Sequence, residues 1–208
     1  MLHHLKLLWI VTGLALWSIS GQTLLAQQAR TRLELTSLTE VQNELKLTDE
    51  QKKLVGELLA KFREGAPANG QVDKEARAAR VKQVAKLNTE LVEKLTDAQK
   101  TRLNGLLIQV NGAVAAIDPV IANALQLSPD ELAKLRSANQ ANQTARRQSA
   151  DGQKDLKPKE RQEAMKKLLA KEGEALMALL TEDQKKKLEE LKGMPLTIDQ
   201  APLRARRK

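Results

Sequence analysis

The sequence of 208 residues contains no cysteine and no tyrosine, and it has only two histidines, two tryptophans and one phenylalanine. Both histidines and both tryptophans lie in the first seventeen residues, as His3, His4, Trp9 and Trp17. The remainder therefore has no imidazole for general acid–base chemistry, no thiolate nucleophile, and no His or Cys to hold zinc, copper, haem iron or an iron–sulfur cluster. We predict a protein that is not an enzyme and that binds no cofactor and no metal.

The histidines and tryptophans belong to a segment with the pattern of an export signal. Lys6 is followed by an uncharged run over residues 7–29, and the first part of this run is strongly apolar. A short basic region followed by such an apolar region is typical of a signal peptide. We predict that residues 1–26 are this signal and that the protein is periplasmic or secreted. The alternative is an uncleaved membrane anchor, because roughly 20 apolar residues can span a bilayer.

Two positions fit signal cleavage. Leu24-Leu25-Ala26 predicts a cut between Ala26 and Gln27, although Leu24 is larger than the residue that usually stands three positions before a cut. Ser18-Ile19-Ser20 is a second candidate.

The formal net charge of +9 is unevenly distributed. Residues 27–118 and residues 119–203 each carry a net charge of +2, and four basic residues close the chain: Arg204, Arg206, Arg207 and Lys208. We predict that residues 196–208 form a basic, disordered tail that could contact a membrane surface. The aromatic stacking platforms of single-strand nucleic-acid binders are missing, so we predict no nucleic-acid partner.

A five-residue pattern, Leu-Thr-x-x-Gln, recurs along the chain. It is complete at residues 47–51, 95–99 and 180–184, and residues 127–131 form a degenerate copy with Ser for Thr and Glu for Gln. In chain order the first and third sites lie 80 residues apart (47 to 127), and the second and fourth lie 85 apart (95 to 180). This spacing predicts a tandem duplication, with a first half over residues 27–118 and a second half over residues 119–195.

Each copy of the pattern predicts the start of a helix. A Ser or Thr hydroxyl can cap the backbone N–H three residues on, while the Gln or Glu side chain reaches back to the N–H of the cap residue. The predicted caps are Thr48, Thr96, Ser128 and Thr181, and their reciprocal partners are Gln51, Gln99, Glu131 and Gln184. The preceding leucines, which we expect to be buried against the new helix, are Leu47, Leu95, Leu127 and Leu180. Residues 38–42 fit the pattern formally, and we expect them to open a short lead-in helix.

Apolar residues at helical spacing predict two longer helices, over about residues 72–94 and 158–179. Polar, glycine-bearing stretches at residues 64–71 and 149–154 predict loops. Residues 139–148 have only alanine as an apolar spacer, so a helix there would pack weakly or very closely. We predict an all-α protein of tandem duplicated helical hairpins, rich in Leu and Ala and elongated or cradle-like in shape.

The repeated pattern after an export signal resembles the LTXXQ-motif family of periplasmic proteins, the Spy/CpxP-like family, in a longer duplicated variety as in planctomycete-type bacteria. Members are small all-helical proteins that dimerise into a curved cradle; one is an ATP-independent chaperone, and another restrains an envelope-stress sensor. The resemblance implies a holder of unfolded envelope proteins. The alternative is a partner-specific envelope-stress regulator or a structural envelope protein. Because the halves are duplicated, we expect either a pseudo-symmetric monomer or a homodimer.

Overall fold

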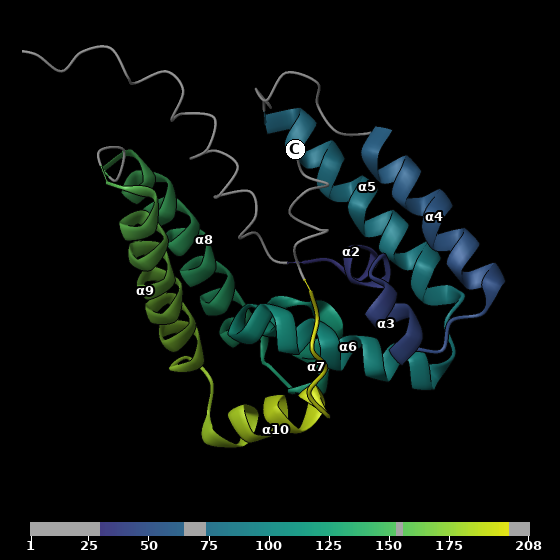
Figure 1. Cartoon of the computed structure of the whole chain (residues 1–208). Coiled ribbons are helices and arrows are strands. Elements are labelled where there is room, and N and C mark those ends of the chain that lie inside the picture. Colours follow the sequence, from purple (N-terminus) through teal and green to yellow (C-terminus); the bar gives the residue numbers. More distant parts are fainter. Residues whose placement is uncertain (1–29, 65–73, 153–155, 200–208) are drawn as a thin grey trace, which may run out of the picture.

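The computed structural model describes residues 30–64, 74–152 and 156–199, which form the coloured ribbon of Figure 1. Over these ranges the chain forms nine α-helices and one 3₁₀ helix, with no strand. The all-α class predicted from the sequence is therefore confirmed. The elements are α2 (Arg32–Thr36), α3 (Thr39–Glu44), α4 (Asp49–Glu64), α5 (Lys74–Glu93), α6 (Asp97–Asn111), η1 (Gly112–Ile117), α7 (Pro119–Ala124), α8 (Pro129–Gly152), α9 (Pro158–Met177) and α10 (Glu182–Lys192).

The helices after α2 fall into two sets of the same order, α3 to α6 and α7 to α10. The short helices that open the sets, α3 and α7, also end alike. Lys46 and Gln126 adopt left-handed φ angles of 49° and 55°. The next residue, Leu47 or Leu127, donates its N–H to the carbonyl oxygen five residues earlier at 3.0 Å. This arrangement is a common helix C-terminus, and here it leads directly into the cap of the next helix.

Two helix pairs form arms on either side of a central body. Figure 1 shows α4 beside α5 in one arm and α8 beside α9 in the other, and both pairs are in contact along the arm. The body contains α2, α3, α6, η1 and α7, and α10 packs against α6. The second arm joins the body through contacts of α8 and α9 with η1.

Helix α2 occupies the centre of the hydrophobic core. Its residues Leu33 and Leu35, and Leu38 between α2 and α3, are at most 2% exposed, and α2 contacts α4, α5 and α6. Burial of each leucine contributes roughly 1.5–3 kcal/mol. Arg32 donates from both terminal guanidinium nitrogens to the carboxylate of Asp118, at 2.7 and 2.8 Å. Since Asp118 is also the N-cap of α7, this ion pair ties α2 to the start of the second set.

The second arm differs from the prediction at its far end. Helix α8 continues to Gly152, whereas a loop was predicted from residue 149, so that boundary is wrong. Residues 139–148 are helical as well, and α8 packs against α9. A partner helix along this segment supports it, because Ala, Gln and Arg have good intrinsic helix propensity even where large apolar side chains are absent.

Several predictions concern residues outside the described ranges. The signal over residues 1–26, its cleavage between Ala26 and Gln27, most of the loop at residues 64–71, and the basic charges beyond residue 199 stay predictions. Of the helices that the structure describes, none combines the length and apolar character needed to cross a membrane.

Candidate functional site

The four predicted cap hydroxyls all lie at helix N-termini. Each accepts the backbone N–H of the residue three positions on, and the oxygen–nitrogen distance is 3.2 Å at Thr48, Thr96, Ser128 and Thr181. The side-chain oxygens of Gln51, Gln99, Glu131 and Gln184 accept the N–H of their cap residues at 2.8–2.9 Å. Each cap hydroxyl and each Gln or Glu side chain thus accepts a backbone N–H group that has no partner within the helix.

The motif leucines lie beneath these caps. Leu47, Leu95 and Leu180 are 4–5% exposed, and Leu127 is half-buried. The apolar residue seven positions after each cap is buried in every copy: Val55, Leu103, Leu135 and Leu188. Each helix start is therefore anchored in the core on both sides of its cap.

The first two motifs also bind one another. The side-chain nitrogen of Gln51 donates to the side-chain oxygen of Gln99 at 2.9 Å, and that of Gln99 donates back at 3.1 Å. Their second N–H groups donate to backbone carbonyls just before the opposite motif, from Gln51 to Lys94 at 2.8 Å and from Gln99 to Leu45 at 3.1 Å. We call this arrangement the first clasp. Every donor of the two carboxamides is used, and the two carbonyls it caps lie at the ends of α5 and α3.

The other two motifs meet through a hydrogen bond to a carboxylate. The side-chain nitrogen of Gln184 donates to Glu131 Oε1 at 3.1 Å, which we call the second clasp. Hydrogen bonds from the Ser128 backbone, the Ser128 hydroxyl and Gln184 lower the pKa of Glu131 below its ordinary value. An ionised carboxylate has no hydrogen to donate, so the second clasp lacks the return bond that Gln51 supplies in the first.

Sequence reasoning identified the caps and missed the clasps, because a local pattern does not say which sites meet. It also missed a capping box in α2, where the Thr31 hydroxyl accepts the Glu34 N–H at 3.2 Å and Glu34 accepts the Thr31 N–H at 2.9 Å. The Thr-x-x-Glu spacing at residues 31–34 was a usable signal. It went unrecognised because Arg30, not a leucine, precedes it.

A charged pair lies between the helices of the second arm. Arg146 Nε on α8 is 3.1 Å from Glu172 Oε2 on α9, and their side chains are only 13% and 9% exposed. Burial raises the pKa of the Glu172 carboxyl, against the opposite effect of the Arg146 charge. The corresponding position of the first arm, 85 residues earlier, is the buried Leu87. The second arm therefore carries a partly desolvated carboxylate at a position where the first arm carries a buried leucine.

Helix α6 holds two non-helical segments by their backbones. The carboxamide of Asn111 accepts the N–H of Arg30 at 2.7 Å and donates to the carbonyl of the same residue at 2.9 Å. Two positions earlier, Gln109 accepts the N–H of Leu196 at 3.0 Å and donates to its carbonyl oxygen. Residues 193–199, which we call the C-terminal strap, pack Leu196 and Ile198 against the core. For residues 196–199 the structure thus differs from the predicted free tail.

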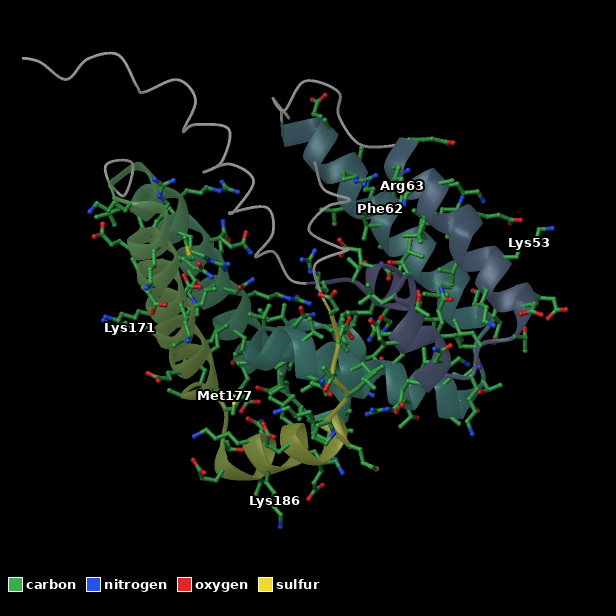
Figure 2. The ribbon with its side chains drawn as sticks, viewed as in Figure 1. Lys53, Phe62, Arg63, Lys171, Met177 and Lys186 are labelled. Atoms are coloured by element: carbon green, nitrogen blue, oxygen red, sulfur yellow. The ribbon has the colours of Figure 1, made fainter. Side chains whose placement is uncertain are left out.

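The lysine run of α10 faces solvent. Lys185 pairs with Glu182 at 2.6 Å and Lys187 with Glu190 at 3.4 Å. Figure 2 shows Lys186 pointing away from the body, as Lys53 and Lys171 point away from the arms. In the part of the chain that the structure describes, no three His, Cys, Asp or Glu side chains are grouped to hold a metal ion.

Comparison of the chain with known protein families, curated proteins and solved structures found no match. The resemblance to the LTXXQ-motif family therefore rests on the motif residues themselves.

Proposed function

We propose that the chain is an exported, non-enzymatic protein that binds other proteins and holds unfolded envelope proteins without ATP. The tandem duplicated hairpins supply the two sides of a cradle-like binding surface. The observation that carries this proposal is the pair of arms that extend from one body (Figure 1). Many residues on the helices of both arms are exposed. One helix of each arm starts at a clasp, α4 at the first and α8 at the second, and the clasp joins that start to the start of α6 or α10.

The exposed face of α5 has the chemistry that such a holder needs. Val81 is 69% exposed, and Ala78 and Ala85 on the same face are exposed too. Lys82 and Lys86 lie beside them and are also exposed. A face that mixes small apolar and basic side chains can contact apolar segments of an unfolded chain while it stays hydrated itself.

The test is the light scattering of a client protein that aggregates on dilution from denaturant, without ATP. Equimolar protein should suppress the scattering, and Val81→Glu should weaken the suppression. The matched control is Val120→Glu, at an exposed valine on α7 in the body. Absence of suppression across several unrelated clients would sink the proposal, and recovery of one stoichiometric partner from envelope extract would favour a partner-specific regulator.

Because one chain supplies both halves, a monomer is sufficient for this function. Mass measurement by light scattering separates a pseudo-symmetric monomer from a homodimer, in which two chains together would build the surface.

A further inference from the structure

Two carboxamide side chains of the α6 region hold neighbouring segments in the same way. Asn111 and Gln109 each place a carboxamide against the N–H and the carbonyl oxygen of one residue, Arg30 in one case and Leu196 in the other. A carboxamide in this position pairs with the backbone as a neighbouring β-strand would. The contact depends on an extended backbone and not on the identity of the side chain.

The close approach of α10 to α6 brings the C-terminal strap to Gln109. A Cβ placed on Gly105 would lie 2.7 Å from the carbonyl oxygen of Lys192, so only glycine fits there. Gly193, with a φ of 66°, then turns the chain out of α10. Figure 1 shows the strap running from the end of α10 across the body.

The strap binds like a short extended peptide. Leu196 and Ile198 are partly buried against the core, whereas Pro195, Thr197 and Asp199 are exposed. We call the place beside Gln109 on α6, where the strap lies against the core, the seat. Alternate residues of an extended chain point to opposite sides, so another segment with two apolar side chains at alternate positions can bind at this seat. Met194 is 79% exposed and contributes little to this contact.

We propose that the seat of the strap on α6 binds an extended segment of another polypeptide, one with apolar side chains at two alternate positions, in place of the strap. The strap then acts as an internal occupant that covers the seat until a client segment displaces it. This inference rests on the proposed protein-binding function and assigns a place on the chain where a client segment binds.

The experiment uses the full-length chain and a fluorescein-labelled peptide with the strap sequence, Gly-Met-Pro-Leu-Thr-Ile-Asp. The double variant Leu196→Ser, Ile198→Ser should release the strap and bind the peptide at least about ten-fold more tightly than the unaltered chain, as measured by fluorescence anisotropy. Met194→Ser, Thr197→Ser is the matched control, because both side chains are exposed, and it should leave the affinity unchanged.

Gln109→Ala, added to the released variant, should remove the gain in affinity. A peptide with serine in place of its leucine and isoleucine should not bind. If the released variant keeps its helical circular dichroism and yet binds no more tightly than the control, the inference is overturned. It is overturned equally if Gln109→Ala leaves the gain intact.

A second measurement does not depend on any variant. In the unaltered chain, saturating peptide should speed hydrogen exchange at the Leu196 amide, and no change would overturn the inference. Peptide binding at the seat and the proposed holding of unfolded proteins are tested separately. A chain that suppresses aggregation but does not bind the peptide contradicts only the seat, whereas peptide binding without suppression contradicts only the holder function.

Discussion

Gln51 and Gln99, which are 48 residues apart in the chain, exchange hydrogen bonds through their carboxamides at 2.9 and 3.1 Å. The same oxygens close the capping boxes at Thr48 and Thr96. Each glutamine thus caps the start of its own helix and also bonds that start to the start of the other helix. The tertiary bond requires both a donor and an acceptor, which gives a physical reason for glutamine, and not glutamate, at the third helical position of these two motifs.

Alanine at Gln51 or at Gln99 should lower the free energy of unfolding by roughly 1–3 kcal/mol, because each change leaves half-buried polar groups without partners. The double variant should cost less than the sum of the two, since both changes remove the same bonds. Urea unfolding followed by circular dichroism measures this coupling. As a control, Gln51→Ala combined with Thr181→Ala, the N-cap of α10, should be additive. Additivity within the Gln51 and Gln99 pair would contradict the first clasp.

Glu131→Gln should change how stability depends on pH. The hydrogen bonds from the Ser128 backbone, the Ser128 hydroxyl and Gln184 lower the pKa of Glu131 from its ordinary value of 4.5. A lowered pKa in the folded state contributes stability above the ordinary value, and that contribution is lost as the pH falls through the lowered pKa. Glutamine does not titrate, and it can donate a return bond as Gln51 does. Melting temperatures from about pH 6 to about pH 3 should therefore fall less for the variant.

The Glu131 prediction has an internal control. Ser128→Ala, which removes one of the hydrogen bonds that lower the pKa, should weaken the pH dependence without abolishing it. Identical melting profiles for the unaltered chain and Glu131→Gln would show that Glu131 makes no linked contribution to stability.

Local signals explain why much of the fold was predictable. Thr96 and Thr181 cap helices because the hydroxyl and its partner three residues on are adjacent in any helical start. Helix α9 was predicted to end at residue 179, close to its end at Met177, because its apolar residues recur at helical spacing. The lead-in helix predicted at residues 38–42 appears as α3, over Thr39–Glu44.

The features that escaped prediction depend on contacts between distant residues. Gln51 meets Gln99 only after α4 and α5 have folded back on one another. Leu196 falls in the predicted tail because no helix is expected after residues 193–195, but Gln109, 87 residues earlier, holds it. The burial of Glu172 beside Arg146 was equally hidden, since an acidic residue on a long polar helix usually faces solvent.

Arg146→Leu alone should destabilise the second arm by about 3 kcal/mol, because it leaves the buried Glu172 carboxylate without this partner. The double variant Arg146→Leu, Glu172→Leu should recover the original stability or exceed it, as an apolar contact replaces a desolvated pair. A buried leucine, Leu87, stands at the position of the first arm that corresponds to Glu172. Urea unfolding of the unaltered chain, the single variant and the double variant measures the order of their stabilities.

The pH dependence gives a second readout for this pair. Burial raises the pKa of Glu172 above its ordinary value of 4.5. A raised pKa in the folded state favours folding at low pH, and the advantage is lost as the pH rises through the raised pKa. The Arg146→Leu variant should therefore lose stability as the pH rises from about 4 to about 7, and Glu172→Gln in the same background should abolish that loss. If the double leucine variant is less stable than Arg146→Leu alone, the pair does not behave as a buried charge.

Gly105→Ala should separate α10 from α6. The new Cβ would lie 2.7 and 2.8 Å from the carbonyl oxygens of Lys192 and Leu191, and because these are backbone atoms, the whole end of α10 must move. Overpacking of this kind costs about 1–3 kcal/mol. Gly56→Ala is the matched control, since it lies inside α4 with no heavy atom within 4 Å of its new Cβ.

Gly56→Ala should raise the free energy of unfolding by about 0.5–1 kcal/mol, because alanine is a better helix former than glycine. Opposite signs for the two glycines are therefore expected in urea unfolding. Because α10 leads into the C-terminal strap, Gly105→Ala should also speed hydrogen exchange at the Leu196 amide, which Gln109 holds at 3.0 Å. Gly56→Ala should leave that amide as protected as before, and equal exchange in both variants would mean that the position of α10 does not govern the strap.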